Sequence, residues 1–439
     1  MTPVMPATAR PAVPAPAVAP GGLAPAGGSI RLAAEHFVAA TLYLLAGALG
    51  LVWVAPELAA GAYLSPPVAG VTHLFTLGWL TLTVFGALCQ LLPVALGTPV
   101  RSTRLAHAGF WAFAPGVGLF AAGVATSRVA LHHAGILLVA AGILLVLANV
   151  GGALPGARTR DVTWAAIALA LGFLASTLVL GIVLLHNLHT GFIGGARVRV
   201  LATHLHVAIV GWLLLMIVGV SHRLLPMFLL SHGANTSWTG RALALLASGV
   251  VVLGAGLTLQ RPAAAWAGAL LMLAGLGCFF RQAYAFYRAR VRRKLDVGMR
   301  FAATALGFLA TSALLGVAVL AAGASRPRLA AAYVITGLLG GIVLYVIGIF
   351  YKIVPLLAWT ARFRGRIGKG PVPTVAQLYS ARLGYVQLWL MAGGVAALAA
   401  GTAAGSPHAA RCGAVLFLGG VLVFLVQLGR VVRGGGAAG

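Results

Sequence analysis

Long apolar stretches, separated by short polar ones, follow one another along almost the whole chain. Runs of about 20 apolar residues, the length that an α-helix needs to cross a membrane, recur from the first span to the last. The backbone of a membrane-spanning segment must pair its polar groups internally, and the alternating ten-residue pattern of transmembrane strands is absent. The pattern predicts an all-α, polytopic membrane protein with about twelve transmembrane helices. We expect them at roughly 36–54, 70–95, 107–125, 132–150, 163–185, 201–229, 240–258, 264–287, 302–322, 331–357, 378–400 and 411–430.

The composition agrees with this prediction, since 61% of the residues are hydrophobic and 8% are charged. Residues 1–30 consist mostly of Ala, Pro and Gly, which predicts a disordered tail. This tail lacks the charged n-region and continuous apolar core of a signal peptide. We expect residues 31–439 to form a single twelve-helix transmembrane domain.

The formal net charge of +26 would also fit a nucleic-acid-binding protein, but its distribution argues against that class. Sorted by the predicted spans, about 23 of the 30 Lys and Arg residues fall on the side that both termini share, and about seven on the other. This is the positive-inside pattern of cytoplasmic membrane proteins. It predicts location in the inner (cytoplasmic) membrane with both termini cytoplasmic, and membrane lipid but no nucleic acid as a partner.

One helix pattern occurs three times, at residues 72–93, 203–226 and 334–355. Each copy ends in a proline, with one glycine fifteen residues and another seven residues before it. The copies fall on the second, sixth and tenth spans, so the period is four helices. We therefore predict three pseudo-symmetric four-helix units at about 31–155, 156–290 and 291–435. The repeated residues are Pro93, Pro226 and Pro355, Gly78, Gly211 and Gly340, and Gly86, Gly219 and Gly348.

The repeated glycines allow two interpretations. They would let neighbouring helices approach closely, or they would let a flat ring lie against the backbone. Arg223 and Lys352 precede two of the prolines. Contact with the cytoplasmic interface explains these cations, and binding of an anionic group such as a heme propionate is the alternative.

Histidines mark the start of two of the three copies. His73 and His206 both stand twenty residues before the closing proline, and Ile335 takes this position in the third copy. An intramembrane histidine normally faces the bundle interior. Two imidazoles at one depth suit axial ligation of a heme iron, although buried, hydrogen-bonded histidines are the alternative. His204 and His206 are two residues apart, so their side chains point some 200° apart. They would serve two sites rather than one.

Most other histidines lie near the ends of the predicted spans, where hydration lowers the cost of a polar side chain. His132, His133, His186, His189 and His408 belong to the end remote from the termini, and His36, His107 and His232 to the other. His186 and His189 are spaced to share a helix face and to hold a metal, but the sequence shows no third ligand. The three cysteines have no CxxC spacing, which favours core packing.

These residues give the chain a resemblance to the catalytic subunit (subunit I) of heme–copper oxidases and nitric oxide reductases, including the related NnrS family. That fold has twelve helices in three pseudo-symmetric groups, with helices two, six and ten lining its pores. The segment THLFTLGWLTLTVFGALCQLLP resembles the family helix whose histidine ligates the low-spin heme, a role that would pass to His73. The segment THLHVAIVGW resembles the HxHxGxLGW helix of cbb-type oxidases. The resemblance implies that His204 binds a high-spin heme and His206 a low-spin heme.

The chain departs from that family in three ways. The HxH motif lies on the sixth span instead of the tenth, and the tenth has no histidine. The seventh span also has none, which argues against a standard copper centre. None of the four acidic residues (Glu35, Glu57, Asp161 and Asp296) lies deep in a span. No carboxylate relay for proton pumping is therefore visible.

The leading hypothesis is a heme-binding membrane protein, with b-type heme, that transfers electrons or binds NO or another small gas in a nitrosative-stress response. Its iron ligands would be His73, His206 and His204. If the protein is an enzyme, we expect an oxidoreductase, with a cytochrome or quinol as electron donor and other respiratory-complex subunits as partners. Two alternatives stay open, a cofactor-free transporter or channel, and a non-catalytic structural subunit or assembly factor of a respiratory complex.

Overall fold

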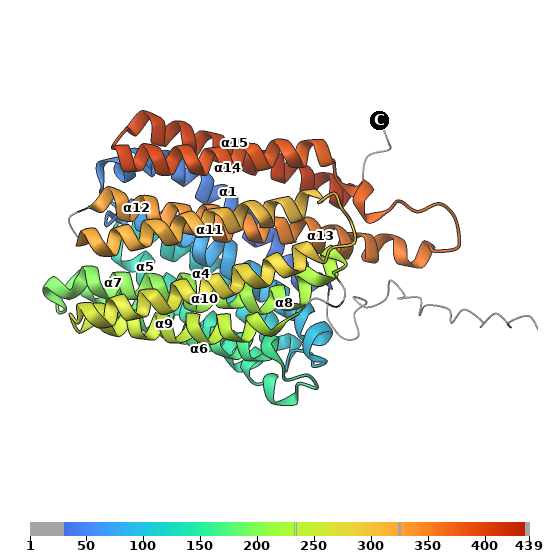
Figure 1. Ribbon diagram of the computed structural model, residues 1–439, viewed down its shortest axis with the longest axis horizontal. Helices are drawn as coiled ribbons and strands as arrows, with labels where there is room; N and C mark the ends of the chain where they lie inside the picture. The colour runs from blue at the N-terminus through green and yellow to red at the C-terminus, as the bar shows by residue number, and fades with distance from the viewer. Residues whose placement is uncertain (1–29, 232, 234, 324–325, 435–439) are drawn as a thin grey trace, which may run out of the picture.

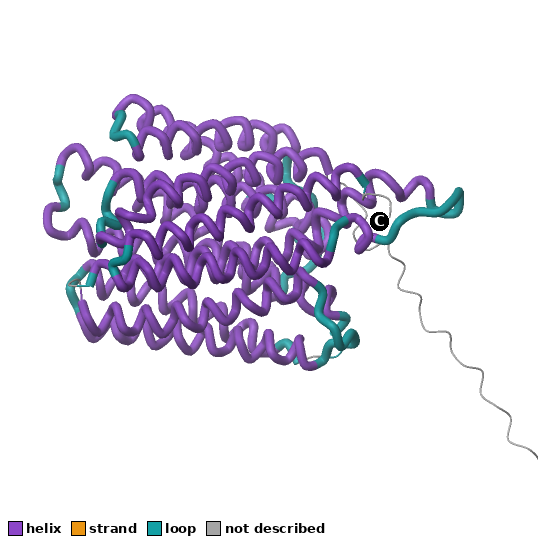
Figure 2. Tube along the Cα trace, turned by 90° about the horizontal axis from the view of Figure 1, so that it is seen from above, coloured by secondary structure: helices purple, strands orange, loops and turns teal. Residues whose placement is uncertain are grey.

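The computed structural model describes residues 30–231, 233, 235–323 and 326–434. These residues form a bundle of helices joined by loops (Figures 1 and 2). Within them, twelve helices are long and apolar enough to cross a membrane, and there is no strand. The predicted all-α, polytopic fold is confirmed. Of the predicted tail only Ile30 is described, and it begins the first helix; His232 also lies outside the described residues.

Eight of the twelve spans are single α-helices. They are α1 (Ile30–Ala60), α4 (Thr103–Ala125), α6 (Val162–Thr190), α9 (Ser237–Thr258), α10 (Pro262–Arg288), α11 (Val297–Ala322), α14 (Ala381–Ala404) and α15 (Pro407–Arg433).

The second, fourth, sixth and tenth spans are composite, because short π- or 3₁₀-helical segments interrupt or extend them. The second comprises α2 (Pro66–His73), η1 (Leu74–Thr81), α3 (Leu82–Leu91) and η2 (Leu92–Leu96). The fourth comprises α5 (Val129–Val146), η3 (Leu147–Gly151) and η4 (Leu154–Gly156). The sixth comprises η5 (Gly194–Ala196), α7 (Arg197–His206), η6 (Val207–Leu214) and α8 (Leu215–Leu229). The tenth comprises α12 (Pro327–Ile335), η8 (Thr336–Val343), α13 (Leu344–Phe363) and η9 (Arg364–Arg366).

Local capping chemistry sets several helix starts. The side chains of Ser102, Asp161 and Asp296 accept hydrogen bonds from backbone N–H groups of the first turns of α4, α6 and α11. The eleventh span begins at Ala381, because Ser380 caps it. The predicted start at roughly residue 378 is a few residues early, since Leu378 ends the short 3₁₀ helix η10 (Val375–Leu378).

The loops gather at the two ends of the bundle. The segments 97–102, 157–161, 230–231, 235–236, 289–296 and 367–380 form what we call the basic end. The loops containing residues 61–65, 126–128, 191–193, 259–261, 326 and 405–406 form the far end. A hydrogen bond joins loop 157–161 to the end of η2, where the Arg158 N–H donates to the Leu96 carbonyl at 2.9 Å. In Figure 1, α8 and α13 lie toward one end of the bundle and α7 and α12 toward the other.

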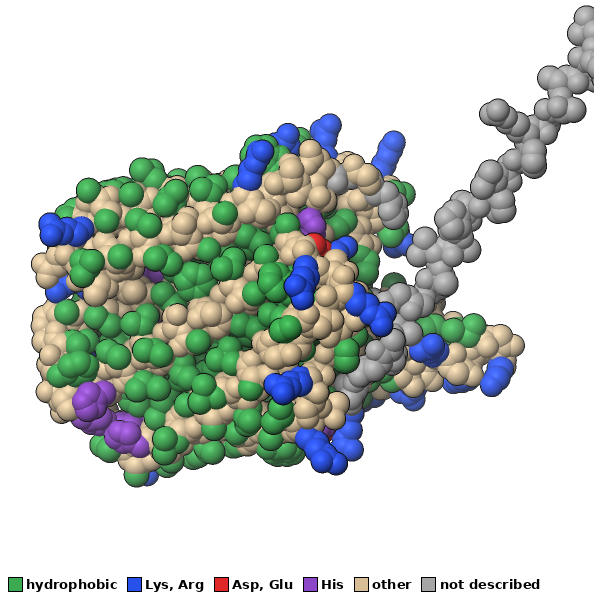
Figure 3. All heavy atoms as spheres, turned by 90° about the horizontal axis from the view of Figure 1, so that it is seen from below, with side chains coloured by type: hydrophobic (Ala, Val, Ile, Leu, Met, Phe, Trp, Pro, Cys, Tyr) green, Lys and Arg blue, Asp and Glu red, His purple; other side chains and the backbone are tan. Residues whose placement is uncertain are grey.

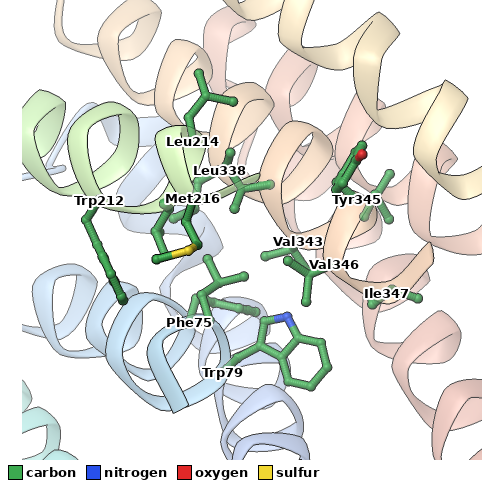
Figure 4. Close-up of a cluster of buried hydrophobic side chains, with 14 of the residues drawn as sticks. Phe75, Trp79, Trp212, Leu214, Met216, Leu338, Val343, Tyr345, Val346 and Ile347 are labelled. Carbon is green, nitrogen blue, oxygen red and sulfur yellow. The ribbon is translucent and has the colours of Figure 1, made fainter. Parts of the chain in front are cut away.

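The three repeated helices form the centre of the bundle. In their most apolar 18-residue windows, 67%, 61% and 83% of the residues are buried in the second, sixth and tenth spans, against 17–56% in the other nine. Their side chains pack together (Figure 4). The Trp212 indole N–H donates to the Thr81 hydroxyl at 3.1 Å, and Ser221 and Tyr345 share a hydrogen bond of 2.6 Å. Side-chain hydrogen bonds therefore join the sixth span to both of the others.

A π-helical segment of eight residues stands at the same register in all three repeated helices. The segments η1, η6 and η8 begin directly after His73, His206 and Ile335, and each ends twelve residues before the closing proline. π-Helical hydrogen bonds run from i to i+5 and leave some carbonyl groups poorly paired, which is why such segments are uncommon and cluster at functional sites. In η1 the hydroxyl of Thr81 donates to the carbonyl of Thr76, five residues earlier, at 2.8 Å.

A second repeat lies in the hairpins α4–α5, α9–α10 and α14–α15, the last two helices of each predicted unit. In each hairpin, four glycines at intervals of seven, twelve and seven residues contact the partner helix so closely that an added Cβ would lie within 3.0 Å of it. They are Gly116, Gly123, Gly135 and Gly142; Gly249, Gly256, Gly268 and Gly275; and Gly394, Gly401, Gly413 and Gly420. Close backbone approach through small residues is the usual way to pack helices in lipid. Symmetry between the three units stays a prediction.

The outer surface suits a membrane. Figure 3 shows, on the face that it displays, hydrophobic side chains over the middle of the bundle and most Lys and Arg side chains toward one end. Large apolar side chains in the middle of helices are exposed on the outer surface, among them Leu137 (71% exposed), Leu314 (72%) and Trp389 (75%). The protein is thus a multi-pass membrane protein in contact with lipid.

Candidate functional site

A cavity of about 680 Å³ lies inside the bundle, within the size range of ligand pockets. Residues of the second, sixth and tenth spans line it, together with residues of α1, α4, α5, α6, α9, α10 and α11. Its walls are mostly leucine, valine and alanine, and its polar groups come chiefly from α2, α7 and α12. His73, His204 and His206 all line this one cavity.

His73 and His206 are oriented by the same local hydrogen bond. Nδ1 of His73 donates to the carbonyl of Ala69 at 2.7 Å, and Nδ1 of His206 donates to the carbonyl of Ala202 at 2.7 Å. Each partner lies one helical turn earlier, so the bond holds the ring in place. With the proton on Nδ1, the lone pair is on Nε2. Metal-binding histidines commonly have this arrangement, which fixes the tautomer and orients the ring.

The surroundings of the two Nε2 atoms differ. The ring of His73 meets Phe120 of α4 edge-on, with 5.0 Å between centroids. The hydroxyl of Tyr333, on α12, lies 3.1 Å from Nε2 of His206 and donates to its lone pair. Any ligand that binds His206 through Nε2 must therefore displace this hydroxyl.

His204 faces away from His206, toward α6. A Cβ added to Gly181 would lie 3.4 Å from its Cε1 atom. Nδ1 of His204 is buried and makes no hydrogen bond within the described part of the chain. The opposite orientations of His204 and His206 follow from their spacing on α7. Both histidines line the same cavity, and the expectation that they serve two sites stays a prediction.

Three arginines line the cavity toward the far end: Arg197 and Arg199 at the start of α7, and Arg326 just before α12. All four acidic residues are described and have other partners. Glu35 pairs with Arg31 and His107, and Glu57 with Ser65; Asp161 pairs with Arg223 and Asp296 with Lys352. Nε of Arg199 is buried without a hydrogen-bond partner in the described chain. The cavity thus combines apolar walls with cations that no carboxylate neutralises, which suits an amphipathic anion.

The repeated glycines serve helix packing. A Cβ on Gly78, Gly211 or Gly340 would lie 2.5–2.6 Å from an aromatic ring, that of Tyr43, Phe173 or Phe308 respectively. These rings belong to α1, α6 and α11. The glycines seven residues before the prolines face the same three helices, at His36, Ala166 and Gly298. The first interpretation, close helix approach, is the one that the contacts support. The alternative, a flat ring against the glycine backbone, is wrong because aromatic side chains and backbone fill that space.

The cations before the closing prolines lie away from the cavity, at the basic end. Arg223 forms an ion pair with Asp161, and Lys352 forms one with Asp296. Neither lines the cavity. The alternative role for them, holding an anionic cofactor group, is therefore not supported, and the three arginines toward the far end are the better candidates.

A separate cluster of three histidines lies at the far end. Ligand nitrogens of His132, His133 and His189 all lie within 4.8 Å of one another, so the cluster has the geometry to bind a metal ion. His132 is buried, and the other two are exposed. His186, which the spacing pairs with His189, instead lies against Phe192 with 5.3 Å between ring centroids. His189 is thus joined by two ligands from α5, His132 and His133, and His186 is not among the three.

The sequence analysis did not identify Tyr333 or the histidine cluster, although the sequence contains a signal for each. Tyr333 stands twenty-two residues before Pro355, the register that His204 has before Pro226. Aligning the third copy position by position would have revealed it. The histidine cluster joins the start of the fourth span to the end of the fifth, and both lie on one side of the membrane. Loop 157–161 joins these two spans at the basic end, so their other ends meet at the far end. Consecutive elements are usually neighbours in space, and this is the signal for such a pair.

Comparison of the sequence with protein-family models and with curated proteins gives no match.

Proposed function

We propose that the cavity holds a heme and that the protein is a heme-binding membrane protein resembling subunit I of the heme–copper oxidases, without a standard copper centre. The observation that carries the proposal is the matched pair His73 and His206. They stand at equivalent positions of the repeat, each lines the cavity, and each has Nδ1 bonded to a carbonyl. Our proposal includes the inner membrane as location, with cytoplasmic termini.

The cavity fits the chemistry of a heme on three counts. Its volume and apolar walls suit a flat, largely apolar ring. Imidazoles from two different helices, those of His73 and His206, would bind its iron. Arg197, Arg199 and Arg326 provide positive charge for two carboxylate groups, as bidentate arginines commonly do. When bound, the heme would supply one-electron redox chemistry and a site for a small gas.

The protein residues have separate tasks in this proposal. The carbonyls of Ala69 and Ala202 accept hydrogen bonds from the two Nδ1–H groups, which keeps both imidazoles in the ligand tautomer. The apolar walls would exclude water from a bound heme, and the arginines would hold its anionic groups. His204, on the other side of α7, would serve a second heme or metal. The four acidic residues take no part, since each has another partner.

The first test is a dithionite-reduced minus oxidised spectrum of the protein purified in detergent after expression with excess heme. We expect sharp bands of a six-coordinate b-type heme, with about one heme per chain. A colourless protein under these conditions would refute the proposal.

Tyr333 offers a sharper test of the role of His206. Tyr333→Phe removes the hydroxyl that competes for Nε2, worth about 1 kcal/mol for a neutral hydrogen bond. We therefore expect heme affinity to rise about fivefold, measured by transfer of heme to apomyoglobin. Tyr345→Phe is the matched control in the same span, because the Tyr345 hydroxyl bonds to Ser221 in the core. Equal heme affinity in wild type and Tyr333→Phe would exclude His206 as an iron ligand.

The three unpaired arginines also favour a second candidate, a cofactor-free carrier of an amphipathic anion. Its expected result is a colourless protein whose cavity binds a fatty-acid or lipid probe, with affinity lost in Arg199→Gln. The spectrum separates the two candidates, since only the first includes a chromophore.

A further inference from the structure

We propose that His132, His133 and His189 form a binding site for a divalent transition-metal ion of the Zn²⁺ and Cu²⁺ class, separate from the heme site. The donors come from two helices: His132 and His133 lie in the first turn of α5, and His189 lies in the last turn of α6. Their ligand nitrogens lie within 4.8 Å of one another. Figure 3 shows histidine side chains gathered at a corner of the end that carries fewer Lys and Arg side chains.

The cluster offers imidazole nitrogen lone pairs of the kind that bind a metal ion. Nε2 of His132 lies 2.8 Å from Nε2 of His189, so without a metal one of them carries a proton that the other accepts. Nδ1 of His133 donates to the carbonyl of Val129 at 3.0 Å, which leaves its Nε2 lone pair free. His132 is only 3% exposed, and its Nδ1 has no hydrogen-bond partner in the described chain. A bound metal would replace the shared proton.

Metal binding would require only a small movement of the imidazole nitrogens. Two imidazole nitrogens on one tetrahedral Zn²⁺, each at about 2.0–2.1 Å from the metal, lie about 3.3 Å apart. The Nε2 atoms of His132 and His189 must therefore separate by about half an ångström. His189 can move, because it is exposed and lies next to the end of α6, which Gly191 caps with a φ of +64°. His133, which is also exposed, can turn toward the ion.

The chemistry of the donors selects the metal. Three neutral imidazoles without carboxylate suit Zn²⁺ or Cu²⁺ and not Mg²⁺ or Ca²⁺, which require oxygen ligands. Three protein ligands leave a fourth position for water. The rings of His133 and His189 are exposed and stack at 5.2 Å between centroids, so the ion would be reached from the aqueous side.

The site would join the fourth span to the fifth, beside the cavity. Ile136, one turn after His132 on α5, and Leu185 and Leu188, next to His189 on α6, line the cavity. The ion would thus link the predicted first and second four-helix units at the rim of the cavity. This inference does not depend on heme.

The test is a Zn²⁺ titration, by competition with a colorimetric chelator, of full-length protein that carries no polyhistidine tag and has been stripped of metal. A Cys412→Ser background removes the exposed thiol of α15 as a competing ligand. We expect one Zn²⁺ per chain, binding at least tenfold weaker in His189→Ala and in His133→Ala. Both residues are exposed, so both variants should fold. Cu²⁺ added in place of Zn²⁺ should give an electron paramagnetic resonance signal split by imidazole nitrogens.

His186→Ala and His408→Ala are the matched controls, because both histidines are exposed at the far end and outside the cluster. Neither change should alter Zn²⁺ affinity, and neither should His73→Ala, which affects only the cavity. Equal Zn²⁺ binding in wild type and in the His133→Ala, His189→Ala double variant would overturn the proposal. So would the absence of binding at 100-fold molar excess of Zn²⁺.

Discussion

Replacement of His73 by Ala is expected to abolish the six-coordinate heme spectrum of the purified protein. His73 is the cavity histidine whose Nδ1 is anchored to a carbonyl and whose Nε2 bonds to no other residue in the described chain. Loss of one strong axial ligand converts a low-spin iron to a five-coordinate, high-spin iron or releases the heme. We expect the sharp reduced bands to be lost and the heme content to fall by more than tenfold, measured by difference spectra and pyridine hemochromogen assay.

The controls follow from the structure. His222→Ala removes a partly buried histidine at the basic end, which bonds to Thr239 and does not line the cavity, and it should leave the spectrum unchanged. Imidazole added to His73→Ala should restore the bands by occupying the space left by the ring. His206→Ala should resemble His73→Ala, whereas His204→Ala should keep the low-spin bands. Unchanged bands in His73→Ala would contradict the proposed ligation.

The second large effect is expected from Gly268→Ala in the hairpin α9–α10. A Cβ at this position would overlap the backbone of Leu253, well within 3.0 Å. Since backbone cannot turn aside as a flexible side chain can, the two helices must separate along the hairpin. Such overpacking typically costs about 1–3 kcal/mol, and we expect the thermal unfolding midpoint in detergent to fall by several degrees.

Gly277→Ala is the matched control on the same helix. Gly277 is exposed, and an added Cβ would meet nothing within 4 Å. Since Ala is favoured over Gly in a helix by roughly 0.5–1 kcal/mol, this change should leave the midpoint unchanged or raise it. The two variants should be heated at the same rate, because unfolding of membrane proteins is often irreversible. Equal midpoints in Gly268→Ala and wild type would show that the hairpin backbones do not touch as described.

Much of this structure was predictable from the sequence, because the membrane simplifies the problem. Apolar runs of fixed length must become helices in lipid, and eleven predicted spans lie within the helices found. The other one, predicted from roughly residue 378, begins a few residues later because Ser380 caps its helix. The copies ending in Pro93, Pro226 and Pro355 identified the three helices that form the centre. The quartets of glycines in the hairpins were equally visible in the sequence, but their role shows only once the partner helix is known.

The candidate sites, too, were predictable in part from the sequence and in part only from the tertiary structure. Register alone placed His73 and His206 at equivalent points of two helices, and helical geometry alone turned His204 away from His206. Only the tertiary structure shows that all three histidines line one cavity and that the Tyr333 hydroxyl donates to Nε2 of His206. It also places arginines without a carboxylate partner near the far end of that cavity. It also supplied His132 and His133 as partners of His189. The physical reason is that periodicity and hydropathy act along one helix, whereas cavities and ligand sets arise between helices, where side-chain shape and packing set each distance.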